Sequence, residues 1–334
     1  MTVLVVGAGI SGVACAQRLR SAGVPVTVLE RSDSPGGRMA SAHVDGRITD
    51  LGASYLTVDD KRFRDALAPL CTDGILRPWT DTFATVQART GVRGTSSGPV
   101  RYAAPRGLAS VVSALAEGLD VRFGTGIDRL SRDASGLFAA AATPRREQTG
   151  ADAELYDAVR YDAVVLAMPA PQALALLDAG FARTRAPLAM QRWEPALALV
   201  ARYDEVPDWI GDGVFVNGDE TLSFAAHDGR RRGDQAPVLV AHSTGGYAAQ
   251  PVTHPDAAAA GAASALSRLL ELPPPQAIRP HRWPYARPLE GSRGPYLLSE
   301  DGIGCCGDAY GTPKVETAWL SGHLLGAALA DRLR

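Results

Sequence analysis

The stretch Val3-Leu-Val-Val6-Gly7-Ala-Gly9-Ile-Ser-Gly12 decides the fold, because an apolar run leads directly into a glycine turn of the pattern GxGxxG. The run predicts a buried strand, and the residues after the turn predict a helix. Gly7 permits the tight turn, Gly9 lets the backbone approach a pyrophosphate, and Gly12 permits close helix packing. The N-terminus of that helix offers N–H groups to phosphate oxygens. The stretch therefore predicts a unit that binds a dinucleotide.

An acidic residue follows at the distance that this unit requires. A second apolar run, residues 24–29, ends in Glu30. A carboxylate at the end of the second strand accepts hydrogen bonds from a ribose diol and would repel a 2′-phosphate. The strand before the turn, the helix after it and the acid together make the GxGxxG pattern far more specific than the glycines alone.

The next segments indicate which dinucleotide binds. Where a nicotinamide dehydrogenase would continue to its next helix and strand, this chain has Ser34-Pro-Gly-Gly-Arg38-Met and then Thr49-Asp-Leu-Gly-Ala-Ser-Tyr-Leu-Thr57. Gly36 and Gly37 allow the backbone to pass close to a cofactor, and Arg38 is a planar fork donor suited to a pyrophosphate. This arrangement is typical of FAD-binding proteins.

A third cofactor segment lies near the C-terminus. Cys305-Cys-Gly307-Asp308 leads into a helix predicted over Val315–Leu329. An aspartate after a buried strand is placed to hold ribityl hydroxyls, and the helix N-terminus stabilises negative charge on a reduced flavin. The three segments agree on FAD.

Composition limits the remaining possibilities. The chain has 334 residues, 46% hydrophobic and 21% charged, with a net charge of −2, which predicts a globular protein of two lobes with no attraction to nucleic acid or membranes. Its four cysteines lack metal-ligand spacing, so we expect no metal site and a reducing, cytoplasmic environment. No apolar run reaches the length of a transmembrane helix. The run Arg230-Arg-Arg232 reads as a solvated surface turn, with a phosphate contact as the alternative.

Cofactor motifs at both ends predict a discontinuous α/β fold, with a Rossmann-like FAD-binding lobe and a second α+β substrate lobe built on an antiparallel sheet. Strands are expected at 197–203, 214–216, 221–226 and 238–243, a helix at 256–272, and a loop at 144–157. The expected FAD-binding domain comprises 1–58, 102–171 and 297–334, and the substrate domain comprises 59–101 and 172–296.

With these motifs in place, the chain resembles the flavin-containing amine oxidase superfamily and, within it, the renalase family. Beyond the FAD fingerprint, the matching stretches are 50–57, 74–78, Ala104-Pro-Arg-Gly107, 161–171, Ala241-His242-Ser-Thr-Gly245, Arg282-Trp283 and Cys306-Gly-Asp308. The resemblance implies noncovalent FAD and oxidation of the 2- and 6-dihydro isomers of NAD(P)H to NAD(P)⁺, with O₂ reduced to hydrogen peroxide. An isomeric dihydronicotinamide is already a hydride donor, so the enzyme mainly has to orient it.

The resemblance also implies site residues. Tyr55, His242 and Trp283 would lie near the flavin and the substrate ring, although His242 could equally be a core histidine and Trp283 a packing residue. The residues expected to contact FAD are Gly7, Gly9, Ile10, Gly12, Glu30, Arg31, Gly37, Arg38, Ile127, Gly307, Asp308 and Val315. The segment Gly245-Gly246-Tyr247 is less bulky than the family pattern, which leaves the shape of the pocket open.

Two alternatives stay open. Monoamine or polyamine oxidases of the superfamily usually carry a lysine near the flavin, and some attach FAD through a cysteine; here no lysine lies between Lys61 and Lys314 and no cysteine between Cys71 and Cys305. A flavin-binding protein without turnover is the other alternative. A lipid or terpenoid desaturase is disfavoured because no extended apolar segment could face a membrane. The sequence does not distinguish NAD from NADP isomers, identify the reactive isomer or the physiological electron acceptor, or indicate an oligomeric state.

Overall fold

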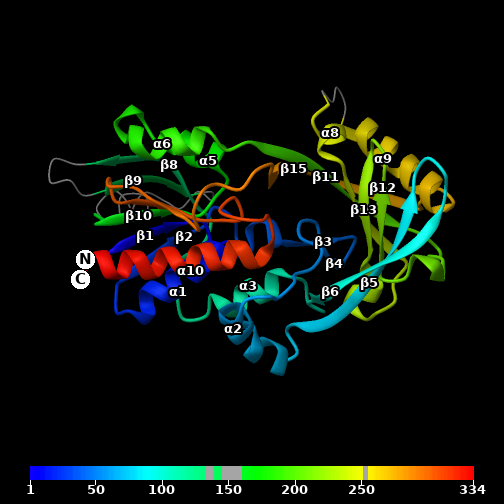
Figure 1. Cartoon of the computed structure of the whole chain (residues 1–334), viewed down its shortest axis with the longest axis horizontal. Coiled ribbons are helices and arrows are strands. Elements are labelled where there is room, and N and C mark those ends of the chain that lie inside the picture. The colour runs from blue at the N-terminus through cyan, green and yellow to red at the C-terminus, as the bar shows by residue number, and fades with distance from the viewer. Residues whose placement is uncertain (133–137, 145–159, 251–254) are drawn as a thin grey trace. The chain divides into compact units, whose positions relative to one another are not determined.

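The computed structural model describes residues 1–132, 138–144, 160–250 and 255–334 (Figure 1). The chain divides into two compact units, each built from separate segments. Unit 1 comprises Met1–Gly37, Val112–Arg192 and Pro288–Arg334, and unit 2 comprises Arg38–Val111 and Trp193–Arg287. The loop expected at 144–157 lies outside the described residues except for Pro144, which ends a strand.

Unit 1 is built on a six-stranded sheet in the order β16-β17-β10-β1-β2-β7. All neighbours pair in parallel except β16, which runs antiparallel to β17. Every residue of β1 is buried, as expected for a parallel strand covered on both faces. The strands are β1 (Val3–Val6), β2 (Val26–Leu29), β7 (Asp120–Arg122), β10 (Ala163–Leu166), β16 (Leu297–Leu298) and β17 (Ile303–Cys305).

Two helices of unit 1, α1 (Ile10–Ser21) and α10 (Val315–Arg332), pack closely against each other (Figure 1). Glycines on α10 make this approach possible. A methyl group on Gly322 would overlap the carbonyl oxygen of Ser11, and one on Gly326 would lie 2.7 Å from the carbonyl oxygen of Cys15. Unit 1 also contains α5 (Ala170–Leu176), α6 (Ala182–Ala189) and the hairpin of β8 (Thr125–Arg132) and β9 (Phe138–Pro144).

Unit 2 is built on a seven-stranded sheet in the order β15-β11-β14-β13-β12-β5-β6. Adjacent strands are antiparallel at β11/β14, β14/β13, β13/β12 and β5/β6, whereas β12 and β5 run parallel. The expected antiparallel sheet is therefore present, with one parallel pair. Its strands are β5 (Arg77–Gln87), β6 (Arg93–Ala103), β11 (Trp193–Arg202), β12 (Gly213–Asn217), β13 (Leu222–His227), β14 (Val238–Ser243) and β15 (Ala277–Pro288).

Helix α9 (Pro255–Leu270) supplies apolar residues to the core of unit 2, among them the buried Leu266. The unit also holds the hairpin of β3 (Ser41–Val44) and β4 (Arg47–Asp50), together with α2 (Lys61–Thr72), α7 (Asp228–Arg232) and α8 (Gly245–Ala248). Helix α3 (Ala109–Leu115) lies where the chain passes from unit 2 to unit 1.

Two expectations differ from the structure. Residues 38–58 and 102–111 group with unit 2, and residues 172–192 and 288–296 group with unit 1, because these segments make most of their contacts there. The interpretation of Arg230-Arg-Arg232 as a solvated surface turn is wrong, because Arg231 is fully buried and Arg232 is 9% exposed. Within the described part of the chain, no helix is long and apolar enough to cross a membrane, and no group of acidic, histidine or cysteine side chains could hold a metal ion.

Candidate functional site

The turn after β1 has the geometry of a phosphate-binding turn. Gly7 has a φ of +103°, and a Cβ atom there would lie 2.8 Å from the carbonyl oxygen of Ala167. At Gly12 a Cβ atom would overlap the carbonyl oxygen of Gly7. Both positions therefore require glycine, for the turn at Gly7 and for close packing at Gly12.

The N-terminus of α1 has neither a capping side chain nor bulky neighbours in the segment that runs beside it. Its N-cap residue is Gly9, and no side chain caps the helix. The segment at residues 36–37 runs beside this turn, because Gly36 N–H donates to the carbonyl oxygen of Ala8 at 3.0 Å and Gly37 has a φ of +56°. Glycine backbone, which carries no side chains, therefore lies beside the first N–H groups of α1. Phosphate oxygens readily accept hydrogen bonds from N–H groups at a helix N-terminus.

Glu30, directly after β2, is buried and held in place by the backbone. Its Oε2 atom accepts from the N–H of Ala8 at 2.8 Å, and Oε1 accepts from the N–H of Ser32 at 2.9 Å. A carboxylate has about four acceptor positions, so these bonds leave capacity for the hydroxyls of a ribose.

The other predicted cofactor residues of unit 1 are spread over several elements. Gly307 and the buried Asp308 follow β17, and β17, β10, β1 and β2 all run parallel. The glycine turn, Glu30 and Asp308 therefore all lie at the carboxyl ends of these strands. Ligands of such sheets bind at the carboxyl ends of the strands. Ile10 and Val315 begin α1 and α10, Ile127 lies in β8, and Arg31 is exposed. The residues of unit 1 fit a dinucleotide.

Arg38 belongs to unit 2, where its guanidinium group and its backbone are both held. Its Nη1 donates to the carbonyl oxygen of Ala286 at 3.0 Å, and its Cζ lies 5.1 Å from the ring centre of Trp193. The carbonyl oxygen of Arg38 accepts from Ala53 N–H at 2.9 Å, and a side chain at Gly52 would overlap that oxygen. The segment at residues 51–54 therefore fixes the position of Arg38.

One backbone carbonyl connects two of the three predicted substrate residues. The carbonyl oxygen of Leu51 accepts from Trp283 Nε1 at 2.9 Å and from His242 Nε2 at 3.3 Å. His242 projects from β14 and Trp283 from β15, so two strands of the sheet hold the segment that also contacts Arg38. The structure therefore brings His242 and Trp283 together, and their place beside a flavin and a substrate ring stays a prediction.

His242 is electrically neutral at physiological pH. Its pKa is lowered to about 4, mainly by burial and in smaller part by the charge of Arg231, whereas the hydrogen bond to Leu51 opposes the shift. Because Nε2 bonds a carbonyl oxygen, the neutral imidazole donates this hydrogen bond. The ring therefore presents no positive charge to a substrate.

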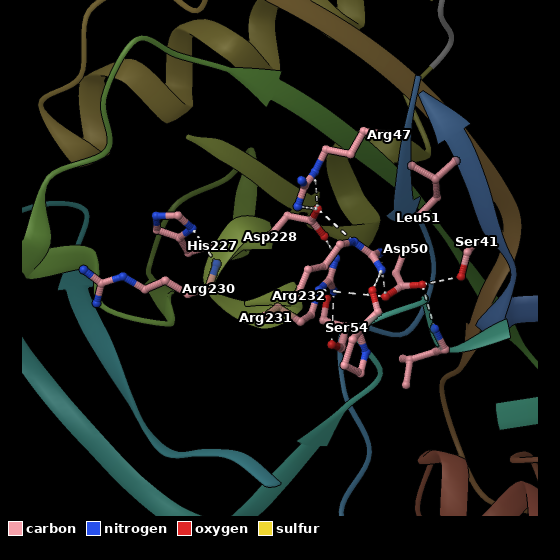
Figure 2. A network of polar contacts seen from close by, with 12 residues as sticks. Ser41, Arg47, Asp50, Leu51, Ser54, His227, Asp228, Arg230, Arg231 and Arg232 are labelled. Atoms are coloured by element: carbon pink, nitrogen blue, oxygen red, sulfur yellow. Dashed lines mark hydrogen bonds and ion pairs between the residues drawn. The ribbon is translucent and has the colours of Figure 1, made fainter. Parts of the chain in front are cut away.

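Beneath the segment at residues 51–54 lies a buried ionic network (Figure 2). Arg231 Nη1 donates to the carbonyl oxygen of Ser54 at 3.1 Å, and Arg232 Nη2 lies 3.1 Å from Asp50 Oδ2. Both arginines also pair with Asp228, which accepts from Arg47 at 2.9 Å as well. Burial alone would raise the pKa of Asp228, but the charges of Arg231 and Arg232 lower it below its usual value. The network anchors the residues on both sides of Leu51.

Tyr55, the third predicted substrate residue, lies in an aromatic cluster of unit 2. Its ring centre is 5.5 Å from that of Phe83 and 6.2 Å from that of Phe224. Phe224 is in turn 6.5 Å from the His242 ring. Tyr55 and His242 are therefore neighbours of the same phenylalanine. The cluster also contains Phe215, in contact with Phe83 and Phe224.

Sequence reasoning did not find the phenylalanines or Arg101, which lies against them. Phe83, Arg101, Phe215 and Phe224 come from β5, β6, β12 and β13, so no local spacing joins them. The only available signal was the presence of aromatic residues in each of several strands of one predicted sheet.

Comparison with known families agrees with this geometry. The model of the NAD(P)-binding Rossmann-like domain matches residues 5–70, and the model of flavin containing amine oxidoreductases matches residues 79–323, well over half of the chain.

Individual relatives match over a short segment in sequence and over the whole chain in fold. Phytoene desaturase of Fusarium fujikuroi is 40% identical over 77 residues, which cover 22% of this chain and only 14% of that relative. A protein of Exiguobacterium sp. provisionally named protoporphyrinogen oxidase has a TM-score of 0.74 at 14% identity, covering 99% of both chains. Cyclohexylamine oxidase of Brevibacterium oxydans has a TM-score of 0.72 at 15% identity, again covering 99% of both. The structural likenesses establish the fold.

Proposed function

Because the chain belongs to the flavin-containing amine oxidoreductase family, we propose that it is a renalase-type oxidase of misreduced nicotinamide dinucleotides. Its cofactor is FAD, which the residues of unit 1 fit. The proposed substrates are the 2- and 6-dihydro isomers of NAD(P)H, and the products are NAD(P)⁺ and hydrogen peroxide.

The observation that carries the proposal is the state of His242 beside Trp283: its Nε2 bonds the carbonyl oxygen of Leu51, to which Trp283 also donates, and its pKa is lowered to about 4, so its imidazole is a weak base. Oxidation of a dihydronicotinamide isomer transfers a hydride from C2 or C6, and the ring becomes aromatic without loss of a further proton. FAD, when bound, supplies the two-electron acceptor, and O₂ then takes the two electrons with two protons to form hydrogen peroxide. Such a reaction requires orientation rather than a base.

The side chains of unit 2 suit a ring that becomes positively charged. His242, with a pKa of about 4, is neutral and does not repel the developing charge of the nicotinamide ring. Its Nε2–H and the Trp283 Nε1–H both donate to Leu51, so neither ring is free to rotate. The partly buried ring of Tyr55, which packs on the buried Phe224, adds flat aromatic surface that suits a planar substrate.

Oxidation of a monoamine or polyamine is the second candidate, and the family match favours it. The lysine that amine oxidases usually carry has no counterpart in unit 2, whose one lysine, Lys61, is 80% exposed and paired with Asp65. The renalase-type reaction therefore agrees better with the residues present.

The test is a product balance under air. The purified flavoprotein is mixed with borohydride-reduced NAD containing the 2-, 4- and 6-dihydro isomers, and each isomer, NAD⁺ and hydrogen peroxide are quantified over time. We expect equal amounts of NAD⁺ and peroxide to form as the 2- or 6-dihydro isomer disappears. Peroxide formed only with amines, including putrescine and cyclohexylamine, would instead assign the protein to the amine oxidases.

A further inference from the structure

Arg101 is a buried cation without an anionic partner. It lies in β6 and is 6% exposed. Its Nη1 atom is fully buried and has no hydrogen-bond partner, and among the described residues no carboxylate pairs with it. The buried arginines Arg231 and Arg232 contrast with it, because each is paired with Asp228 and Asp50.

Aromatic rings surround the guanidinium group. Its Cζ lies 4.3 Å from the ring centre of Phe83, 5.6 Å from that of Tyr55 and 6.0 Å from that of Phe215. Cation–π attraction offsets part of the cost of burying a guanidinium ion, but it satisfies none of the five N–H donors. A buried charge is normally paired, so the surroundings of Arg101 are incomplete without an anion.

Arg101 is beside the candidate substrate residues. Leu56 and Tyr102 form a backbone bridge, with Leu56 N–H donating at 3.2 Å and Tyr102 N–H donating at 2.8 Å. In this antiparallel bridge Tyr55 faces Ala103, and Tyr55 and Arg101 are diagonal neighbours, with the Arg101 Cζ 5.6 Å from the Tyr55 ring centre. Through Phe224, the same aromatic cluster reaches His242.

We propose that Arg101 binds an anionic group of the substrate and that, on the proposed function, this group is the phosphate attached to the nicotinamide ribose. A guanidinium fork matches two phosphate oxygens and forms charge-assisted hydrogen bonds with them. The same charge repels an ammonium group, so the site discriminates against cationic amines. Arg101 is thus a specificity-determining residue of the substrate site.

The experiment compares substrates that differ only in this phosphate. The values of kcat/KM are measured for the 6-dihydro isomers of nicotinamide mononucleotide and nicotinamide riboside, with the wild-type flavoprotein, Arg101→Met and Arg101→Lys. Arg89→Met, which removes an exposed arginine in the turn between β5 and β6, is the control. The oxidised mononucleotide and the oxidised riboside are also titrated into each protein, and the change in flavin absorbance gives the dissociation constant of each compound. The ratio of these two constants measures the same preference in binding alone.

The wild type is expected to prefer the mononucleotide by roughly 10- to 100-fold, the value of one strong charged hydrogen-bond pair. Arg101→Met should lose this preference with little change for the riboside, Arg101→Lys should retain part of it, and Arg89→Met should keep all of it. Equal use of the two substrates by the wild type, or an unchanged preference in Arg101→Met, would overturn the assignment of Arg101. Oxidation of neither substrate by a wild type that oxidises the 6-dihydro isomer of NADH would overturn this inference alone, whereas failure to oxidise the 2- and 6-dihydro isomers of NADH as well would overturn the proposed function.

Discussion

At the scale of single residues, His242 connects the chemistry to the stability of unit 2. Its pKa of about 4 lies well below the ordinary value of 6.5, mainly because the ring is buried. As the pH falls below 6.5, the unfolded chain takes up a proton at this position and the folded chain does not. The stabilising effect is therefore present above pH 6.5 and is lost on acidification towards pH 4.

We predict that His242→Gln removes this pH dependence. The difference in unfolding free energy between wild type and variant should decrease by about 2 kcal/mol from pH 7 to pH 5. Urea denaturation at several pH values measures it. A difference that stays constant over this range would show that the ring is not held neutral.

The buried network under Leu51 leads to a second prediction at this scale. Asp228→Asn leaves Arg231 and Arg232 with one buried carboxylate, Asp50, and leaves Arg47 with the half-exposed Asp234. The loss of a buried partner costs about 3–5 kcal/mol. We therefore expect a large decrease in the denaturation midpoint together with weaker FAD retention, because the network holds the segment that positions Arg38.

Asp208→Asn is the matched control for Asp228→Asn. Asp208 pairs with Arg230 but is fully exposed, so solvent screens the pair and its removal should change the midpoint little. Similar midpoints for the two variants would mean that the network does not act as a buried ionic cluster.

At the scale of elements, the packing of α10 on α1 depends on glycine. Gly322→Ala places a methyl group against the backbone oxygen of Ser11, which cannot move without displacing α1. We expect a destabilisation of about 1–3 kcal/mol and a lower FAD affinity, because the shift moves the N-terminus of α1. Thermal unfolding and equilibrium dialysis against FAD measure the two effects.

Gly246→Ala provides the comparison within another helix. A Cβ atom at Gly246 in α8 meets nothing within 4 Å, so the substitution should be neutral or stabilising by about 0.5–1 kcal/mol. Equal destabilisation by both variants would contradict the packing account.

The elements also show how far the sequence alone predicts this structure. Residues 3–30 produced the strand, turn, helix and strand at the expected places, because each of these signals is local. Arg230-Arg-Arg232 was misread because two of its partners, Asp50 and Ser54, lie far away in the sequence, and no local signal shows that the nearby partner Asp228 is buried with them. A run of arginines with glycine and aspartate has the same composition whether it is solvated or paired inside a core.

The residues of the candidate site likewise comprise some that the sequence identifies and others that only the fold brings together. Glycine motifs identify a cofactor turn directly, and the resemblance pointed to His242 and Trp283, which the structure joins at the Leu51 carbonyl. Arg101 and its rings required the order of strands β6, β5, β12 and β13, which hydrophobic periodicity does not provide.

At the scale of the whole molecule, the chain passes between the two units at residues 37–38, 111–112, 192–193 and 287–288. FAD binding to the folded protein stabilises it by mass action, about 2.7 kcal/mol when free FAD is one hundred times its dissociation constant. We therefore predict that removal of FAD lowers the melting temperature and that added FAD restores it.

Glu30→Gln should weaken this stabilisation selectively. The substitution removes the carboxylate of Glu30, which we propose accepts hydrogen bonds from the ribose of FAD. The affinity for FAD should therefore fall by roughly 10-fold. We compare the variant with the wild type in the same state, FAD-free or FAD-saturated. The decrease in melting temperature should be smaller in the FAD-free state than in the FAD-saturated state. An unchanged affinity would exclude Glu30 from the cofactor site.

The most direct test of the central claim is to mix the flavoprotein anaerobically with separated 2-, 4- and 6-dihydro isomers of NADH and with putrescine, and to follow the visible absorbance of the flavin. The account predicts rapid bleaching by the 2- or 6-dihydro isomer and slow or no bleaching by the 4-dihydro isomer and the amine. Bleaching by putrescine alone would contradict it in favour of an amine oxidase, and a flavin that none of these compounds reduces would contradict it in favour of a flavin-binding protein without turnover.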